Sequence, residues 1–227
     1  MLVLFIIYTF KRIFKRANTF GSLKSYVSKI KYLLPLLLIS MSSLNEELPV
    51  TELLSFTVIN KNATIGFINI EKQTQNETTT YTINSDISAK VLFKFNAVAK
   101  ETSIYKRDTL VFSSVYRKLN NKEKRNQSLL FNNGTYTLKN KNKVEPLNID
   151  FITRNLVTLY FQEPVGVTSV FCDNQNEMVQ VKSLGNGMYK VQFSKGKYNI
   201  FHYKDGKCVK IEAFNPMFEV TLIPVLS

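Results

Sequence analysis

The 227-residue sequence contains one histidine, two cysteines and no tryptophan. Catalysis that uses histidine would therefore depend on His202 alone, and a metal site built from several histidines is excluded. Cysteine, aspartate and glutamate also form no set with the spacing of metal ligands. We expect neither a metal site nor a cofactor.

The sequence also contains no apolar run long enough to cross a bilayer, which takes roughly 20 residues. The apolar run at residues 32–41 is too short and is interrupted by Pro35. Three lysines precede it and small residues follow it, which is the pattern of a secretory signal peptide. The residues are Lys24, Lys29 and Lys31 before the run, and Ser40, Ser42 and Ser43 at its end.

We therefore predict a leader at residues 1–43, with cleavage after Ser42 or Ser43. Residues 1–30 are either an upstream extension before the true start or a membrane-associated segment. Because the leader has no cysteine, a lipoprotein box is excluded. The mature protein is expected in the periplasm or associated with the outer envelope.

The net charge of +13 suggests a nucleic-acid partner, but its location argues against one. Residues 1–43 hold seven basic and no acidic residues, so the remainder has 23 basic and 17 acidic residues, an ordinary balance. Basic tips at residues 117–125 and 139–143 have few adjacent aromatic rings on which bases could stack. We expect solvated tips, or peripheral contact with an anionic membrane, and no nucleic-acid partner.

Aromatic and β-branched residues favour strands: there are 17 Phe and 11 Tyr. The strongest alternation of apolar and polar residues covers residues 79–99, which is too long for one strand, so we expect a bend or two strands that meet near residues 89–92. Short alternating runs separated by Asn-Gly and Asp-Gly turns follow, up to residue 223. The fold predicted for residues 44–227 is a single all-β domain, an antiparallel curled sheet or half-barrel of about ten strands.

Residues 151–164 differ from the rest, because Ile152, Leu156, Leu159 and Tyr160 recur at helical spacing. Pro164 cannot continue a helix. We predict a short helix near residues 153–159 that packs on the concave face of the sheet. Glu163, directly before Pro164, is expected to hold this segment in place by accepting backbone N–H groups or by pairing with a lysine.

Several sequence pieces resemble an exported bacterial family, domain of unknown function family 6134. The most specific piece is Tyr160-Phe161-Gln162-Glu163-Pro164, and the likeness extends over residues 53–223. Weaker pieces are Ile65-Gly66, residues 108–114, Val170-Phe171 and residues 198–206. The resemblance implies a curled antiparallel sheet, similar to periplasmic half-barrels that carry lipids or lipoproteins.

The concave apolar face of the predicted sheet is the feature that most directly suggests a function. It is either an ordinary closed core or a cavity for an acyl chain or apolar peptide. The residues predicted to line this face and to contact a ligand are Tyr81, Ile83, Phe93, Phe95, Phe112, Tyr160, Phe161, Tyr189 and Phe193. The structural motif is Tyr160, Phe161, Glu163 and Pro164.

Cys172 and Cys208 are either a disulfide, which export would permit, or two buried free thiols. His202 is expected to form a cross-strand hydrogen bond or to be exposed. We name no catalytic residue and expect a binding protein for an apolar or lipid-like ligand. A structural or interaction module of the envelope and a hydrolase that uses His202 remain as alternatives.

Overall fold

The computed structural model describes residues 48–225, apart from 91–93, 142 and 217. The predicted leader at residues 1–43 lies outside the described residues. Residues Leu48–Ser227 form one compact unit. In its described part, no helix has the length and apolar character needed to cross a bilayer.

The described part contains fourteen strands and one 3-10 helix. The strands are β1 (Val50–Asn60), β2 (Ala63–Gln75), β3 (Thr78–Lys90), β4 (Lys94–Lys106), β5 (Thr109–Leu119), β6 (Lys122–Asn132), β7 (Thr135–Asn140), β8 (Lys143–Leu147), β9 (Ser169–Cys172), β10 (Glu177–Gly185), β11 (Met188–Ser194), β12 (Lys197–Lys204), β13 (Lys207–Asn215) and β14 (Phe218–Pro224).

All fourteen strands belong to one antiparallel sheet, in the order β8-β7-β6-β5-β4-β3-β2-β1-β14-β13-β12-β11-β10-β9. The first strand therefore lies in the middle, paired with β2 on one side and β14 on the other. The sheet curls but does not close, because β8 and β9 remain its two ends. The prediction of an all-β, antiparallel curled sheet is confirmed.

The long alternating run becomes two strands, as expected from its length. Lys90 and Lys94 are the last paired residues of β3 and β4, close to the predicted position. Strand β8 has no clear signal in the sequence, because Pro146 and the charged Lys143 and Glu145 hide its alternation. Proline is tolerated there because β8 is an edge strand.

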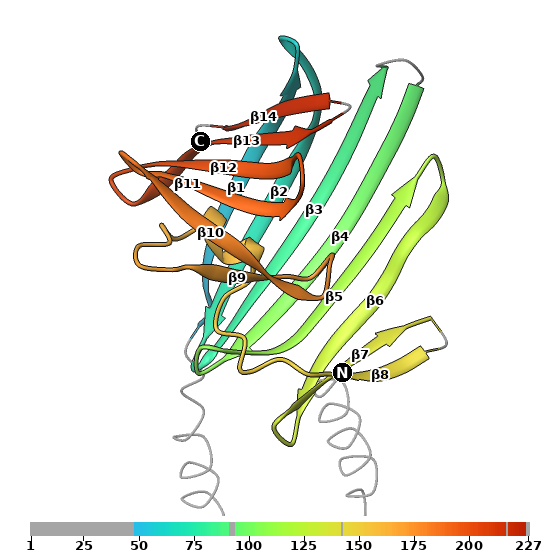
Figure 1. Ribbon diagram of the computed structural model, residues 1–227, viewed down its shortest axis with the longest axis vertical. Helices are drawn as coiled ribbons and strands as arrows, with labels where there is room; N and C mark the ends of the chain where they lie inside the picture. The colour runs from blue at the N-terminus through green and yellow to red at the C-terminus, as the bar shows by residue number, and fades with distance from the viewer. Residues whose placement is uncertain (1–47, 91–93, 142, 217, 226–227) are drawn as a thin grey trace, which may run out of the picture. The chain divides into compact units, whose positions relative to one another are not determined.

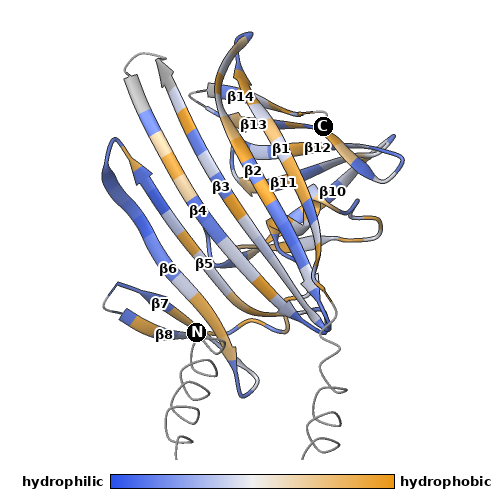
Figure 2. Ribbon diagram, turned by 180° about the vertical axis from the view of Figure 1, so that it is seen from behind, coloured by the Kyte–Doolittle hydropathy of each residue, from blue (hydrophilic) through white to orange (hydrophobic). Residues whose placement is uncertain are grey.

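Strands β9 to β14, residues 169–224, form what we call the carboxyl-terminal arm. Figure 1 shows this arm lying over one face of the long strands β1 to β5, and Figure 2 shows those strands from behind. Hydrophilic and hydrophobic bands follow one another along β2 to β5 in Figure 2. This alternation directs apolar side chains to the face that the arm covers and polar side chains outward.

The predicted short helix is present as a five-residue 3-10 helix, η1 (Leu156–Tyr160). Val157, Thr158 and Leu159 are buried there, and η1 contacts β9 and β13. Ile152 does not belong to this helix, although its spacing suggested so. It lies in an extended segment, where its carbonyl accepts the N–H of Leu110 at 2.8 Å.

The buried side chains form two apolar clusters, and Ile152 and Leu159 belong to different ones. The larger cluster joins the arm to β1 and β2 and includes Phe56, Leu159 and Phe201. The smaller cluster surrounds Ile152 beneath β5 to β7. Strand β9 contributes to both clusters, so it is buried on both faces and reads as a continuous apolar run.

Candidate functional site

A cavity of about 620 Å³ lies between the long strands and the carboxyl-terminal arm. Its walls come from the inner face of β2 to β5, from η1, from the turn after β9 and from β11 to β13. A volume of roughly 300–1,000 Å³ is typical of small-molecule sites. The sequence allowed either a cavity or a closed core on this face. The described structure contains a cavity with room for a ligand.

One part of the cavity wall is apolar. Alternation places the inward-facing residues of β2 to β4 here, and η1 adds three residues, Leu156, Val157 and Tyr160. The apolar lining residues are Ile68, Tyr81, Ile83, Ile87, Ala97, Ala99, Leu156, Val157, Tyr160, Phe193 and Phe214. The Tyr160 ring is fixed by edge contacts with Phe56 and Phe201, at centroid distances of 5.4 and 5.8 Å.

The other part of the wall is polar and centres on Asn155, whose side chain is 1% exposed. Its Oδ1 accepts a hydrogen bond from the Tyr105 hydroxyl at 2.8 Å. Its Nδ2 donates to Ser103 Oγ at 2.8 Å and to Asp173 Oδ2 at 2.7 Å. One amide therefore joins β4 to the turn after β9, and its polar atoms are satisfied despite burial.

Asp173 is the most unusual group at this end of the cavity. Its side chain is 7% exposed, and its Oδ1 is buried without a hydrogen-bond partner in the described structure. Burial raises the pKa of the Asp173 carboxyl to about 6, and nearby Glu101 adds to the shift. The neighbouring Ser113 hydroxyl and the Asn155 amide oppose it.

The turn that carries Asp173 is held rigidly against the inner face of β6. Gln127 Nε2 donates to the Asp173 carbonyl at 2.5 Å and to Asn176 Oδ1 at 2.6 Å. Gln175 Nε2 donates to the Phe193 carbonyl at 3.1 Å, while Gln175 Oε1 is buried without a partner. The turn thus carries two buried, unpaired acceptor oxygens on Asp173 and Gln175, two residues that line one end of the cavity.

An ion pair between neighbouring strands also lines the cavity. Arg117 on β5 donates from Nε and Nη2 to Glu101 Oε1 on β4, at 3.2 and 2.5 Å. Both contacts are partly buried. The positive charge of Arg117 is therefore already engaged by a carboxylate of the same wall.

The structure places three of the predicted ligand-binding aromatics in the cavity wall: Tyr81, Tyr160 and Phe193. Phe161 lies next to it, packed on the Tyr81 ring at a centroid distance of 5.5 Å. Tyr189 is buried in the larger apolar cluster instead. Phe93 and the side chain of Phe95 lie outside the described part of the chain.

Phe112 faces the other side of the sheet, which corrects the prediction. The register of β4 and β5 shifts after Ile104, which pairs with Phe112, so Val111 is an extra residue. Such a bulge reverses the parity that points inward: Leu110 is buried before it and Ser113 after it. Phe112 consequently stands beside Ile104 on the outward face and does not line the cavity.

The motif residues Tyr160, Phe161, Glu163 and Pro164 hold the end of η1 against the arm. Glu163 Oε1 accepts the Tyr189 hydroxyl at 2.9 Å, so its partner is a tyrosine and not the expected backbone group or lysine. Tyr203 donates to the Leu159 carbonyl at 2.5 Å. Two tyrosines of the arm thus fix the segment that closes one side of the cavity.

Cys172 and Cys208 are buried free thiols, so the disulfide alternative is not what the structure contains. Burial raises the pKa of Cys172 to about 11 and that of Cys208 to about 12, which keeps both protonated at neutral pH. Cys172 lines the cavity.

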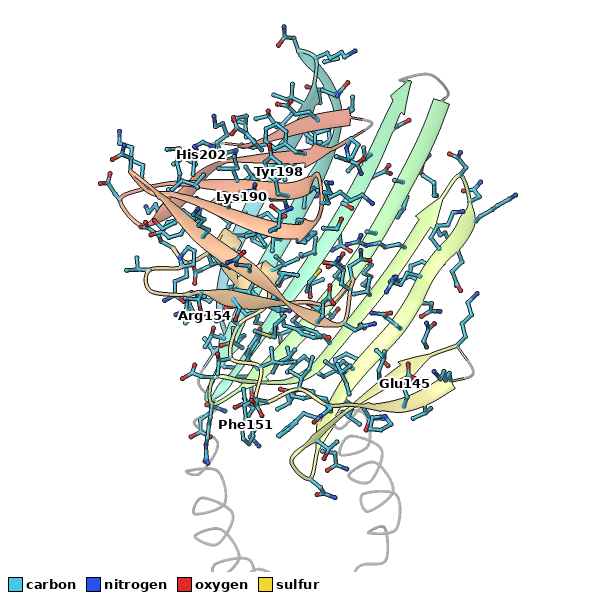
Figure 3. The ribbon with its side chains drawn as sticks, in the orientation of Figure 1. Glu145, Phe151, Arg154, Lys190, Tyr198 and His202 are labelled. Atoms are coloured by element: carbon cyan, nitrogen blue, oxygen red, sulfur yellow. The ribbon has the colours of Figure 1, made fainter. Side chains whose placement is uncertain are left out.

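His202 forms the expected cross-strand contact: its Nε2 lies 2.9 Å from Glu212 Oε2. Figure 3 shows His202 in the arm near Lys190 and Tyr198, whose ammonium and ring lie 4.0 Å apart. None of these three residues lines the cavity. Among the described residues, no group of three or more His, Cys, Asp or Glu is placed to hold a metal ion.

Sequence reasoning missed the polar end of the cavity. A signal was present in β4, where the inward parity of Ala97 and Ala99 continues into Glu101 and Ser103. Polar residues at inward positions of a strand indicate a buried polar site. The position of Asp173 opposite this strand depends on the curl of the sheet and had no local signal.

The family model described as Domain of unknown function (DUF6134) matches residues 56–225. The chain belongs to the DUF6134 family. The resemblance inferred from the Tyr-Phe-Gln-Glu-Pro segment is thereby confirmed, and the DUF6134 match spans the whole cavity lining, from Ile68 to Asn215.

Among solved structures, the DUF6134 chain is similar to a beta-barrel-like protein of domain of unknown function DUF1849 from Brucella abortus. The identity is 13% and the TM-score is 0.49, over 78% of this chain and 95% of that chain. A comparison with curated proteins finds no match.

Proposed function

We propose that this protein is an exported, non-enzymatic binding protein that holds an apolar or lipid-like ligand. The observation that supports it most is the cavity of about 620 Å³, whose apolar wall faces a smaller polar end. Ligand sites in proteins commonly combine a mostly apolar lining with a few fixed polar groups. An amphipathic molecule, with an apolar body and a polar head group, fits that division.

Export is supported by the leader pattern at residues 1–43, with its lysines, short apolar run and small residues. A carrier also has to reach the membrane from which it takes its ligand. Exposed lysines at the β5–β6 tip, Lys118, Lys122 and Lys124, give an electrostatic means of contact with anionic lipid. Lys118 is also part of the cavity wall, which places this tip next to the cavity.

A hydrolase is less well supported, because His202 is bonded to Glu212 outside the cavity lining. A structural or interaction module of the envelope is the alternative that a ligand-free protein would favour.

The first test is native mass spectrometry of the full-length chain purified from its own host. A co-purifying lipid-like molecule is expected. The second test is titration calorimetry with decanol, a probe with an apolar chain and a small neutral head. Decanol is expected to bind the unsubstituted protein with 1:1 stoichiometry.

A matched pair of variants then locates the binding. Ala99→Trp places a large ring in the cavity wall and is expected to weaken decanol binding by about tenfold or more, equivalent to ~1.4 kcal/mol. Lys100→Trp puts the same ring on the exposed outer face of β4 and should leave the affinity unchanged. Equal affinities of the two variants, with both folded by circular dichroism, would contradict binding in this cavity.

A further inference from the structure

Two acceptor oxygens at the polar end of the cavity have no partner among the described residues. They are Asp173 Oδ1 and Gln175 Oε1, each with essentially no exposure to solvent. Both residues line the cavity. Leaving a buried acceptor unpaired costs free energy, and a donor placed opposite it recovers that cost.

These oxygens cannot easily turn away to find another partner. The other carboxylate oxygen of Asp173 is held by Asn155 Nδ2 at 2.7 Å, and the amide nitrogen of Gln175 is held by the Phe193 carbonyl. The backbone of the turn is anchored through Gln127. The acceptors are therefore fixed in position before any ligand binds, which lowers the entropy cost of binding.

The charges around Asp173 favour a positive or hydrogen-bond-donating group. Glu101 and Tyr105 face it from β4, the Ser113 hydroxyl from β5 and Cys172 from β9, and Arg117 lies near Cys172. Arg117 is paired with Glu101, and the Tyr105 hydroxyl and the Cys172 thiol are uncharged at neutral pH. With Asp173 ionised, the charged groups of the cavity lining are the carboxylates of Asp173 and Glu101 and the cations of Arg117, Lys118 and Lys197. Glu101 and Arg117 neutralise each other, so a cationic head group would find the Asp173 carboxylate as its partner.

We propose that the cavity selects an apolar molecule whose head group donates hydrogen bonds to Asp173 Oδ1 and Gln175 Oε1, a protonated amine above all. A hydroxyl head is accepted more weakly, and an anionic head is repelled by Asp173 and Glu101. This selectivity rests on the proposed function, since the apolar body of the ligand fills the rest of the same cavity.

The test compares decylamine, decanol and decanoate, which share one apolar chain and differ only in the head group. Calorimetry at pH 8.0 is expected to give a Kd for decylamine that is about 10- to 100-fold below that of decanol, the range for a hydrogen bond to a charged group. Decanoate is expected to bind most weakly.

The variant Asp173→Asn keeps the shape of the side chain but replaces the charged carboxylate by a neutral amide. The amide has one acceptor oxygen and one donor nitrogen. It is expected to abolish the preference for decylamine over decanol while retaining decanol binding. Asp86→Asn, on the exposed outer face of β3, is the matched control and should behave like the unsubstituted protein.

A measurement on the unsubstituted protein removes any dependence on the folding of the variant. Because the pKa of Asp173 is about 6, lowering the pH from 8.0 to 5.0 protonates it while decylamine stays cationic. The affinity ratio of decylamine to decanol should fall by most of its value at pH 8.0. In Asp173→Asn the affinity ratio should not change over the same range, because the carboxyl that takes up the proton is absent.

The outcomes distinguish this selectivity from the binding function itself. If no decyl compound binds, the proposed function fails. If decanol binds and all three heads have equal affinity at both pH values, the binding function stands and the assignment of the head group is overturned. That second result would mean that water alone satisfies Asp173 and Gln175.

Discussion

Replacing Asn155 by alanine removes three hydrogen bonds from the interior of the described structure. The side chain is 1% exposed and joins the Tyr105 hydroxyl, Ser103 Oγ and Asp173 Oδ2. Each partner comes from another segment and becomes a buried polar group without its bond. The substitution therefore separates the turn after β9 from β4.

The magnitude follows from the number of unpaired groups. A buried donor or acceptor left without a partner costs about 1–3 kcal/mol. For two groups that lose their bond outright, Tyr105 and Asp173, and a Ser103 hydroxyl that can rotate, the loss is about 3–6 kcal/mol. This is a large share of the roughly 5–15 kcal/mol that stabilises a typical domain.

Urea denaturation followed by far-ultraviolet circular dichroism measures this change. A second substitution tests its cause, because Tyr105→Phe removes the hydroxyl that Asn155→Ala leaves unpaired. Alone, Tyr105→Phe should cost about 1–3 kcal/mol, whereas in the Asn155→Ala background it should be neutral or stabilising. Additive effects, or a loss below ~1 kcal/mol in Asn155→Ala, would refute the reasoning. Asn84→Ala, exposed on the outer face of β3, should stay within about 0.5 kcal/mol.

The remaining predictions concern three other features. The raised pKa of Asp173, about 6 against 3.8, means that its stabilising contribution is present below pH ~3.8 and is lost as the pH rises through 6. Relative to Asp173→Asn, the free energy of unfolding should fall by about 3 kcal/mol over that range in urea titrations. Gly66→Ala should lower the melting temperature strongly, by about 4–12 °C, because its Cβ would lie 2.2 Å from the Asp86 carbonyl oxygen of β3. Cys172 and Cys208 should react with a thiol reagent at pH 8 only slowly in the folded protein and fully after denaturation, and fast reaction in the folded state would contradict their burial.

Much of the fold could be predicted from local patterns. Period-two alternation and turn pairs identify most strands, since each signal lies within a few neighbouring residues. A glycine inside a strand, such as Gly66, indicates a bulge or a close backbone contact, and the register shifts between Val58 and Ile59 opposite it. The bulge at Val111 had no comparable signal, because valine is an ordinary strand residue. One unpredicted extra residue was enough to place Phe112 on the wrong face.

The site was harder to predict, because it is assembled from segments far apart in the sequence. Asn155 and Asp173 lie 18 positions apart and meet Ser103 only because the sheet curls. Their helical spacing predicted that Ile152 and Leu159 lie on one face of the same helix. In the structure they pack in separate clusters, and Asn155 lies between them in the sequence. A pattern of apolar residues thus concealed the polar residue between them that organises the cavity.

Asp173 is one of three described residues, with Arg154 and Gln175, that bury a side-chain polar atom without a hydrogen-bond partner. A buried carboxylate with one oxygen unpaired lowers the stability of the folded protein at neutral pH, and asparagine at this position would remove the cost of burying a charge. Packing therefore does not explain why position 173 is an aspartate, whereas recognition of a hydrogen-bond-donating head group does. If Asp173→Asn stabilises the protein without ligand and also abolishes the preference for decylamine, stability and binding oppose one another at this position. Such opposition is expected of a functional residue and not of a structural one.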